Sequence, residues 1–419
     1  MTQVIEERLG GLGSVGTAKE TTLGTPVLPT DFIDVDSCTL QADPGWFSPA
    51  VITASRSKQV YDGYGQAKIE GNVENPLYPA MGVSLLAGSI GIDGAPGLGV
   101  TSVGASAITT LSASAAVGAT TVTVTSATGI AANDIIQIDV NSATGPTTSE
   151  CVTVVSIATD TLTITPALVY SHAASVSVLL APANPTFQHI IIPSNTLPSF
   201  TIEKNLGDFQ SEQYSGCRVN KLTLKAQSTN TPVSVTQAIL GTGWNPLSTP
   251  SPIARLANQS IYTFAGASLT QTINGTSATL VAQAQNLTVN IDNGLQVEYT
   301  MANSNFPQFN TPGAIVANGD VELIWSSLTD PNWGYFQNMG PGAAADFNLA
   351  FDFQIPNTGT ATSSISVIYP KAKISKLVDD MKLDAVIKST ITFEALRTSY
   401  LGYNGEVILK IVNSQNTPY

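Results

Sequence analysis

The sequence repeats one order of expected elements, and this repetition constrains the fold more than any other feature. Residues 65–74 (GQAKIEGNVE) indicate a strand, and a short apolar segment at 77–90 follows it. Much later, residues 318–325 (NGDVELIW) indicate a similar strand, followed by residues 330–340 (DPNWGYFQNMG). Each copy therefore predicts a strand and then a short helix-like stretch that ends at glycine. A chain with two similar units can replace two subunits of a ring, which favours assembly over catalysis.

Further strands are expected to close each copy. They span 197–204 and 220–241 in the first copy, and 364–370 and 371–396 in the second. Two patterns compete in the last of these segments, because four apolar residues have helical spacing: Ile374, Leu377, Val378 and Met381. Residues 385–393 are instead β-branched and partly alternating, so we interpret the segment as two strands joined near Asp379 and Asp380.

The composition divides the chain into consecutive parts. They are an N-terminal arm at 1–33, a first unit at 34–103 and 184–245, an inserted small β domain at 104–183, a second unit at 253–412 and a tail at 413–419. The insertion has short alternating stretches at 119–125, 134–140, 151–157 and 161–165 with turn residues between them. Residues 244–252 (WNPLSTPSP) predict a linker, and residues 81–87 predict a short buried helix stopped by Gly88.

Charge and composition limit the classes of function. The 419 residues carry a formal net charge of −13, only 11% are charged, and Lys and Arg are absent from 69 to 203. Proteins that grip nucleic acid need clustered Lys and Arg, so this composition argues against them. An acidic surface would instead let DNA pass without sticking. The high content of Thr, Ser, Val and Gly favours a β-rich protein with large buried contacts.

The cysteines and the start of the chain bear on its cellular context. Cys38, Cys151 and Cys217 are odd in number, far apart and outside any CxxC pattern, so we expect free thiols and synthesis in a reducing cytoplasm. No basic segment followed by an apolar one begins the chain, so we expect no secretory signal. Residues 79–100 are interrupted by glycines, Asp93 and Pro96 and are too weakly apolar for a membrane span.

No motif predicts catalysis, a cofactor or a metal site. Residues 11–16 (GLGSVG) match G-x-G-x-x-G, but no strand precedes them and no βαβ unit follows, which favours a flexible arm over a dinucleotide site. His172 and His189 lie in different parts of the chain, which favours solvent or interface positions over a metal pair or catalytic dyad.

Acidic and aromatic clusters also have ordinary interpretations. Asp34 with Asp36, and Asp379 with Asp380, lack the pattern of a calcium loop, so turn or surface positions are expected. Four aromatic residues are expected in the core or an interface rather than a ligand pocket: Trp325, Trp333, Tyr335 and Phe336.

Several stretches together resemble the tail tube proteins of long-tailed bacteriophages, in the group whose polypeptide holds two tube-type units. The likeness is carried by 16–26 (GTAKETTLGTP), 65–73 (GQAKIEGNV), 198–204 (PSFTIEK), 214–224 (YSGCRVNKLTL), 391–396 (ITFEAL) and 407–413 (VILKIVN). Their order along 16–103 and 184–413 carries more weight than any single stretch. The insertion departs from the family and resembles small β modules on the outside of phage structural proteins.

The resemblance implies a mainly β fold with two tandem tail-tube-type β-sandwich or half-barrel units, each with a short helix, plus the inserted all-β domain. Six units close a ring in relatives, so two units per chain imply trimeric rings that stack into a tube around a DNA channel. The implied partners are further copies of the chain, the tape measure protein, tail terminator and tip proteins, and genomic DNA that passes without specific contacts. The implied location is the virion tail, after synthesis and assembly in the host cytoplasm, with no membrane and no enzymatic activity.

Alternatives from other classes stay open. Another virion component would share most of these features. A bacterial surface-layer or adhesin-like protein would share the Thr-rich β composition, but it should show an export signal. A hydrolase or glycan-binding protein would need clustered carboxylates or a ring of aromatic residues, and neither stands out.

Two sets of residues are candidates for functional positions. Ile69 and Glu70 are expected to match Val321 and Glu322, and strand alternation would place the two glutamates on one face. We expect these carboxylates to line the channel, with an outer solvent face as the alternative. The arm is expected to connect one ring to the next through its apolar residues: Val4, Ile5, Leu9, Leu12 and Leu23. The insertion is expected to be dispensable for the tube wall.

Overall fold

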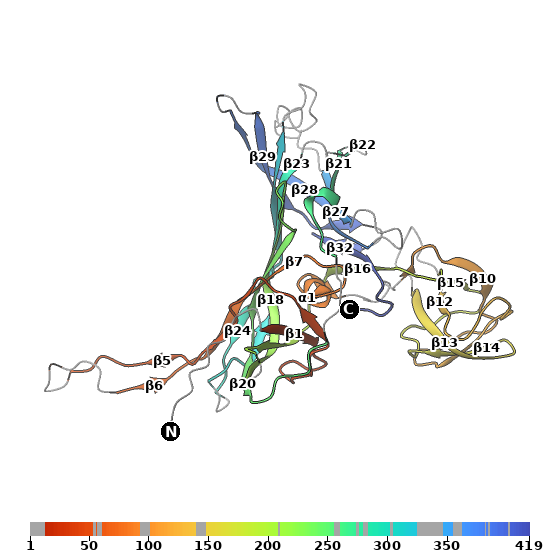
Figure 1. The fold of residues 1–419 in the computed structure, drawn as a ribbon, viewed down its shortest axis with the longest axis horizontal. Coiled ribbons are helices and arrows are strands. Elements are labelled where there is room, and N and C mark those ends of the chain that lie inside the picture. The colour runs from red at the N-terminus through yellow and green to blue at the C-terminus, as the bar shows by residue number, and fades with distance from the viewer. Residues whose placement is uncertain are drawn as a thin grey trace.

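The fold is mainly β, as the sequence predicts (Figure 1). It is seen in a computed structural model that describes residues 13–52, 56, 61–92, 101–139, 148–207, 210–254, 260–273, 276–279, 284–301, 305–324, 347–354, 363–381, 383, 386–400 and 403–419. Within this part of the chain, no helix is long and apolar enough to cross a membrane.

A first set of strands comes from residues 14–247, here called the first repeat. They are β1 (Ser14–Lys19), β2 (Asp31–Ile33), β3 (Ser37–Cys38), β4 (Gln41–Asp43), β7 (Lys68–Pro76), β17 (Phe200–Asn205), β18 (Ser211–Gln227), β19 (Ser234–Leu240) and β20 (Gly243–Leu247). The expected linker at 244–252 is therefore wrong over its first residues, because β20 pairs with the start of β18.

A second set of strands comes from residues 267–413, here called the second repeat. They are β21 (Ala267–Ile273), β22 (Thr276–Thr279), β23 (Ala284–Asp292), β26 (Val316–Ile324), β27 (Phe347–Gln354), β28 (Ser364–Asp380), β29 (Lys388–Ala395) and β32 (Ile408–Asn413). β28 and β29 confirm the interpretation of two strands joined after Asp379 and Asp380, and the helical alternative is wrong. A 3₁₀ turn, η2 (Phe264–Gly266), precedes β21.

The strand pairing of the first repeat recurs in the second. β1 pairs with β2 and β17, β17 with β18, β18 with β19 and β20, and β7 with β19, β3 and β4, all antiparallel. In the second repeat, β21 pairs with β22 and β27, β27 with β28, β28 with β29 and β32, and β26 with β29 and β23. The strands therefore correspond one to one in chain order, with β23 in the place of β3 and β4.

β-Bulges at matching places in the two repeats show which individual residues correspond. The β18–β19 register shifts between Val219 and Lys221, and the β28–β29 register shifts between Ile374 and Lys376. A second shift separates Phe200 from Ile202 in β17, and the matching one separates Phe347 from Leu349 in β27. Counting from these bulges, the fully buried Tyr214 and Tyr369 occupy equivalent positions.

The glycines of β7 and β26 correct one expected match. Gly71 lies opposite Ile239, and Gly319 lies opposite the equivalent Phe393. At both sites the neighbouring backbone is so near that a Cβ would lie 2.4 Å from it. Because both positions require glycine, Gly71 and Gly319 are equivalent. Glu74 and Glu322 each lie three residues after this glycine, so Glu74, and not Glu70, is the counterpart of Glu322.

Three strands connect the repeats to each other and to the insertion. They are β8 (Gly91–Ile92), β9 (Thr101–Ser102) and β16 (Phe187–Pro193). β16 pairs with β8 and β9 and also with β32 of the second repeat. One apolar cluster accordingly contains residues of both repeats, among them Leu222, Val289, Val321 and Ile374. The two repeats share a core and a sheet.

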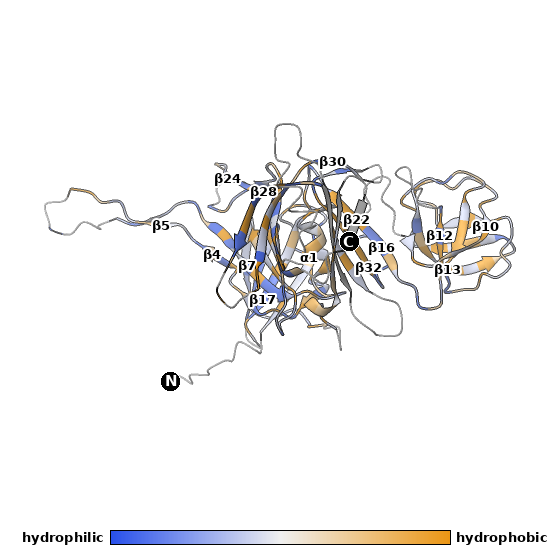
Figure 2. Cartoon of the chain, turned by 90° about the horizontal axis from the view of Figure 1, so that it is seen from above, coloured by the Kyte–Doolittle hydropathy of each residue, from blue (hydrophilic) through white to orange (hydrophobic). Residues whose placement is uncertain are grey.

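Residues 106–180 form a separate sheet at one end of the molecule (Figures 1 and 2). Its strands are β10 (Ser106–Thr110), β11 (Thr121–Thr123), β12 (Ile135–Ile138), β13 (Glu150–Ala158), β14 (Thr161–Thr165) and β15 (Ser177–Leu180). Its buried residues, such as Val122, Ile136 and Val152, form a cluster of their own. The chain enters and leaves side by side, because Ser102 pairs with Phe187 and the Val103 N–H donates to Thr186 O at 2.8 Å.

Three hairpins extend from the main sheets. They are β5 (Trp46–Phe47) with β6 (Gly63–Tyr64), β24 (Gln296–Glu298) with β25 (Phe309–Thr311), and β30 (Thr398–Tyr400) with β31 (Tyr403–Gly405). The β5–β6 hairpin and the β24–β25 hairpin follow equivalent strands, β4 and β23. Figure 1 shows β5 and β6 projecting away from the body of the molecule.

Helix α1 (Val83–Gly88) confirms the short buried helix expected at 81–87. Its N-cap, Gly82, has a φ of 70°, which favours glycine, and its N–H donates to Asp31 Oδ2 at 2.9 Å. Val83 and Leu86 pack into the shared core, and Figure 2 shows α1 between the strands of the two sides. The second helix expected at 330–340 lies outside the described residues.

We predict that Asp31→Asn stabilises the chain at neutral pH. Burial raises the pKa of Asp31 from 3.8 to about 6, although the hydrogen bond from Gly82 opposes this. Between these pH values the unfolded state releases the proton and the folded state keeps it, so the free energy of unfolding falls as pH rises. The variant has no charge to bury and can still accept the Gly82 hydrogen bond. Its gain should reach up to about 3 kcal/mol at pH 7.5 and vanish near pH 3.5.

Urea unfolding of both proteins at the two pH values checks this prediction. A gain of the same size at both pH values, or a loss at pH 7.5, would contradict it.

Candidate assembly interface

A backbone pairing joins the two repeats within the chain. Residues 221–227 of β18 pair with residues 286–292 of β23, in antiparallel register from Lys221 opposite Asp292 to Gln227 opposite Asn286. On the apolar face, Leu222 and Leu224 meet Ile291 and Val289 in the shared core. The sheet therefore runs from β7 through β19, β18, β23 and β26 to β29 and β28 without a break.

Polar side chains mark the register of this joint on the opposite face. Lys221 Nζ lies 2.9 Å from Asp292 Oδ2, and Thr223 Oγ1 donates to Asn290 Oδ1 at 3.0 Å. Burial would raise the pKa of Asp292, but hydrogen bonds from Lys221 and Gly294 hold it below its usual value. Both partners of the ion pair are partly exposed, so it contributes little energy and mainly selects the register.

The β24–β25 hairpin completes the joint by packing on the first repeat. Asn310 is fully buried, and its Nδ2 donates to Gly216 O at 2.7 Å and to Leu240 O at 2.9 Å. Asn293 Nδ2 donates to Ser89 O at 2.8 Å and to Val219 O at 2.9 Å. These two amides thus satisfy four carbonyls of the first repeat, which explains why polar side chains occupy buried positions.

Both strands of this joint, β18 and β23, have equivalents elsewhere in the chain. Each equivalent lies at an outer edge of the sheet, where the described residues place no strand in the partner's position. Residues 376–379 of β28 are equivalent to 221–224 of β18, and they pair with β29 alone among the described residues. β3 and β4 are equivalent to β23, and in the same part of the chain they pair with β7 alone. Exposed sheet edges are templates for pairing with another chain. The interface of interest is therefore a pair of complementary edges and has no catalytic geometry.

Large apolar side chains are exposed beside both edges. Val378 is 45% exposed in β28, and Trp46 and Phe47 are 54% and 51% exposed in β5. Leu295, the counterpart of Trp46 after β23, is only 9% exposed because the first repeat covers it. Equivalent positions thus differ in burial according to whether a partner repeat is present.

Glu70 and Glu322 lie on the same polar face of the continuous sheet. Ile69 and Val321 point into the core, as the alternation predicts, with exposures of 2% and 3%. Glu322 Oε1 lies 2.6 Å from Lys388 Nζ, and this hydrogen bond holds the pKa of Glu322 below its usual value although burial opposes it. Glu322 also accepts a hydrogen bond from Asn286. Glu70 is exposed, and the described residues offer it no ion pair.

The expected N-terminal arm is wrong for much of its length. β1 lies between β17 and β2 and buries Val15, because its short apolar and small residues fill a central strand position. The last three residues of the GLGSVG stretch, 14–16, therefore lie in a strand. Of the expected contact residues, Leu23 is half-buried within its own chain. The others lie outside the described residues: Val4, Ile5, Leu9 and Leu12.

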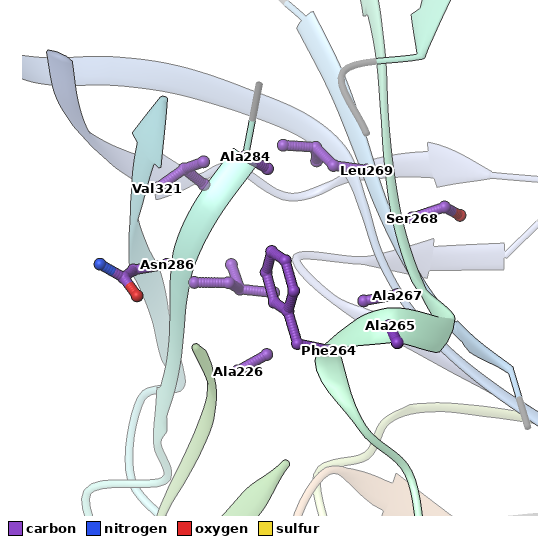
Figure 3. A pocket seen from close by; sticks show the side chains of 10 residues that line it. Ala226, Phe264, Ala265, Ala267, Ser268, Leu269, Ala284, Asn286 and Val321 are labelled. Carbon is purple, nitrogen blue, oxygen red and sulfur yellow. The ribbon is translucent and has the colours of Figure 1, made fainter. Parts of the chain in front are cut away.

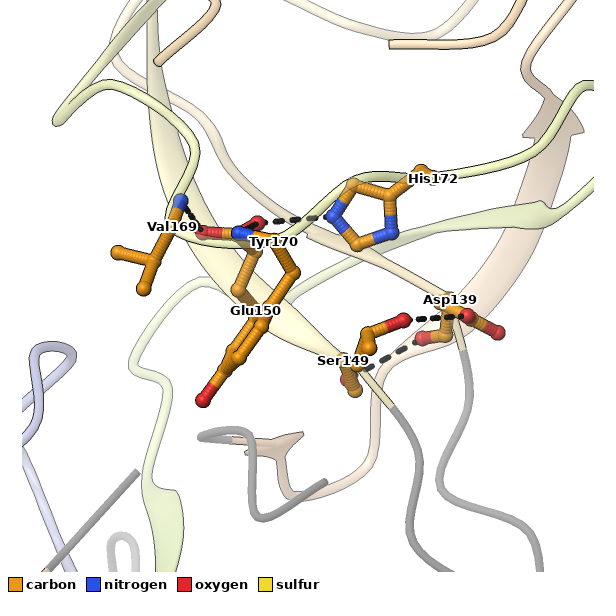
Figure 4. Close-up of polar contacts among 7 residues, drawn as sticks. Asp139, Ser149, Glu150, Val169, Tyr170 and His172 are labelled. Atoms are coloured by element: carbon orange, nitrogen blue, oxygen red, sulfur yellow. Dashed lines mark hydrogen bonds and ion pairs between the residues drawn. The ribbon is translucent and has the colours of Figure 1, made fainter. Parts of the chain in front are cut away.

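The expected solvent or interface positions of the two histidines are also wrong, because both are buried. His172 Nε2 lies 2.8 Å from Glu150 Oε1, and the same carboxylate accepts the N–H groups of Val169 and Tyr170 at 2.9 and 3.1 Å (Figure 4). This network holds the loop after β14 onto β13. His189 contacts Gln415 O at 2.8 Å and so ties β16 to the C-terminal segment.

Other chemistry is sparse in the described part of the chain. It contains no group of three or more His, Cys, Asp or Glu residues that could hold a metal ion, and its three cysteines form no disulfide. The largely apolar pocket in Figure 3, of about 160 Å³, lies between β18, β21 and β23 and is lined by Phe264, Leu269 and Val321. The expected aromatic cluster lies outside the described residues: Trp325, Trp333, Tyr335 and Phe336.

Comparison with protein families agrees with the resemblance seen in the sequence. The family model described as phage tail tube protein matches residues 10–395. The chain therefore belongs to the phage tail tube protein family, and it is a structural component of a virion tail. A comparison with curated proteins found no match.

Sequence reasoning missed the residues that form the joint. Asn293, Asn310 and the Lys221–Asp292 pair show no pattern of their own. The available signals were the paired stretches VNKL at 219–222 and ISKL at 374–377, which share the bulge, and the turns DPG at 43–45 and DNG at 292–294.

We predict that Asn310→Ala loosens the joint between the repeats. The substitution leaves Gly216 O and Leu240 O buried without their donor, which should lower the free energy of unfolding by about 2–4 kcal/mol. Asn245→Ala, on the exposed face of β20, is the matched control and should change it by less than about 0.5 kcal/mol. Urea unfolding measures both. Equal effects of the two substitutions would contradict the assigned role of Asn310.

Proposed function

We propose that the chain polymerises into stacked rings that form the wall of a phage tail tube. The observation that carries the proposal is the joint between β18 and β23, whose two halves recur at opposite outer edges of the same chain. A contact between two different surfaces of one subunit generates a ring when the rotation closes. Closure would also pair the edges that otherwise invite uncontrolled association.

We propose three chains per ring. The strand pairing occurs twice in the chain, and six tube-type units close the ring in relatives. Two units per chain then give a trimer with pseudo-sixfold symmetry, in which joints within chains alternate with joints between chains.

We propose that the polar face of the continuous sheet lines the channel. It carries Glu70 and Glu322, while the opposite face is filled by the shared core and α1. Glu322 is offset by Lys388, so Glu70 is the better candidate to repel passing DNA phosphates. Glu70→Gln and Glu70→Lys should progressively slow genome ejection from otherwise intact virions. Equal ejection rates for both variants and the native tail would place Glu70 elsewhere.

Other partners follow from the family. A tube of this kind encloses a tape measure protein, ends at terminator and tip proteins, and forms after synthesis in the host cytoplasm. Interaction of purified tubes with the terminator protein of the same phage tests this part, and tubes that fail to bind it would argue against the assignment.

We propose that residues 1–12 connect one ring to the next through Val4, Ile5, Leu9 and Leu12. A truncation that tests this role must stop before β1, because removing the buried Val15 would damage the core. Deleting residues 2–12 should leave the free energy of unfolding within about 0.5 kcal/mol and raise the critical concentration for polymerisation at least several-fold. Sedimentation of assembled tubes measures this concentration. Unchanged polymerisation would count against the inter-ring role.

We predict that the separate sheet at 106–180 is dispensable for the tube wall. Val103 and Thr186 are already hydrogen bonded as neighbours, so residues 104–185 can be replaced by a two-residue Asn-Gly turn. Electron microscopy should show hollow tubes for the full chain, and tubes of equal inner diameter but smaller outer diameter for the deletion. A folded deletion variant that forms no tubes would contradict dispensability. A folded full chain that never forms rings or tubes would contradict the proposed function.

A further inference from the structure

We infer that β28 of one chain pairs with β4 of the next chain in the register of the internal β18–β23 joint. This inference rests on the proposed function and supplies the contact between subunits that the function requires. It assigns the partner of each exposed edge as a second copy of the same chain. It also assigns the residues that meet.

The register follows from the residue correspondence between the repeats. The matching bulges in β18 and β28 make Lys376 the counterpart of Lys221. The equivalent glycines, Gly71 and Gly319, make Asp43 the counterpart of Asp292. Transferring the internal pairing then gives three consecutive pairs between chains: Lys376 with Asp43, Leu377 with Ala42 and Val378 with Gln41.

Charge supports this register. The internal joint places Lys221 Nζ 2.9 Å from Asp292 Oδ2, and the transferred joint again places a lysine, Lys376, opposite an aspartate, Asp43. Both residues are exposed in the single chain and are therefore accessible to a partner. A shift by two residues would place Lys376 opposite Gln41 and remove the ion pair.

The turn after β4 directs the β5–β6 hairpin as the turn after β23 directs β24–β25. Gly45 and Gly294 both have positive φ, at 67° and 54°, and each N–H donates to the preceding aspartate Oδ1 at 2.9 Å. The β24–β25 hairpin packs on the first repeat. The β5–β6 hairpin is thus aimed at the second repeat of the next chain, where Trp46 and Phe47 would become covered.

The counterpart of Asn310 on this hairpin is an aspartate. Asp62 occupies the position of Asn310, counted from the matched pairs of the two hairpins. In the internal joint, the Asn310 amide donates to the backbone carbonyls of Gly216 and Leu240, and Arg218 donates to the backbone O of Asn310. The counterpart of Arg218 is Lys373, which can make the same contact with the Asp62 carbonyl of the next chain, but the Asp62 carboxylate has no donor for the carbonyls equivalent to those of Gly216 and Leu240.

The joint between chains is weaker than the joint within the chain at one point. Asn293 donates its backbone N–H to Asn220 O at 2.8 Å and its amide to two more carbonyls. Its counterpart is Pro44, which has neither a backbone N–H nor a side-chain donor. The chain can therefore hold its two repeats together permanently and still associate reversibly with the next chain.

Cysteine cross-linking tests the register. The Asn293 N–H donates to Asn220 O, so these residues form a hydrogen-bonded pair of the antiparallel ladder. Hydrogen-bonded and non-hydrogen-bonded pairs alternate, which makes Thr223–Asn290 a non-hydrogen-bonded pair with Cα atoms about 4.5 Å apart. The equivalent Val378 and Gln41 then lie within disulfide reach. The test protein carries Val378→Cys and Gln41→Cys in a Cys38→Ser background. The matched control replaces Gln41→Cys with Thr39→Cys, two residues away on the same face.

Oxidation of assembled Val378→Cys/Gln41→Cys protein should give covalent closed oligomers on non-reducing gels, at least tenfold more than the control pair or either single cysteine. Tubes that form without cross-links, or that cross-link better in the control pair, would overturn the register and leave the proposed function standing. Absence of tubes for the native chain would instead defeat the proposed function.

A charge exchange gives an independent readout should the cysteines impair folding. Lys376→Asp and Asp43→Lys should each raise the critical concentration for assembly several-fold. The double variant should recover the part of the loss that comes from the ion pair, but not the part that comes from the lost acceptor of the Gly45 N–H. Additive losses in the double variant would overturn the Lys376–Asp43 pair.

Discussion

The backbone pairing between β18 and β23 is the interaction on which the rest of the structure depends. It turns two sets of strands, each with an edge that would otherwise remain open, into one continuous sheet with one core. Leu222 and Leu224 are buried in a cluster that β23 and β26 extend beyond the first repeat. Sheet edges are a hazard in any β protein, and here the chain itself covers one such edge.

The two repeats differ where their surroundings differ. The second repeat inserts its hairpin residues into the first and satisfies buried carbonyls with Asn293 and Asn310. The first repeat carries Pro44 and Asp62 at the same positions, and neither side chain can donate these hydrogen bonds. The first repeat also accommodates a separate sheet between β9 and β16, and this sheet has an apolar core of its own. We propose that one architecture serves both as the permanent joint within the chain and as the assembly joint between chains.

Much of the strand content could be predicted from the sequence, because alternation is a local property. β7, β26, β29 and β11 to β14 of the insertion lie where alternating or β-branched stretches indicate them. β10 and β15 were missed, and the single strand expected at 220–241 is instead the end of β18 followed by β19. β1 was missed because Gly and small residues give it no alternation, yet its neighbours β17 and β2 bury it from both sides. The buried His172 was likewise missed, because its partner Glu150 comes from a distant stretch.

The candidate interface could be predicted only in outline. The repetition suggested a ring, but the matching of Glu70 with Glu322 followed sequence similarity alone. The true register depends on where Gly71 and Gly319 meet a crossing strand, and that contact is nonlocal. Which edges remain open depends on every pairing in the chain, so no single motif could reveal them.

Cryo-electron microscopy of the assembled tube, reconstructed without imposed symmetry, tests the central claim most directly. We predict three chains per ring, with six similar wall segments in which internal joints alternate with joints between β28 and β4. A ring of six complete chains, or a wall in which β28 meets no neighbouring strand, would contradict it.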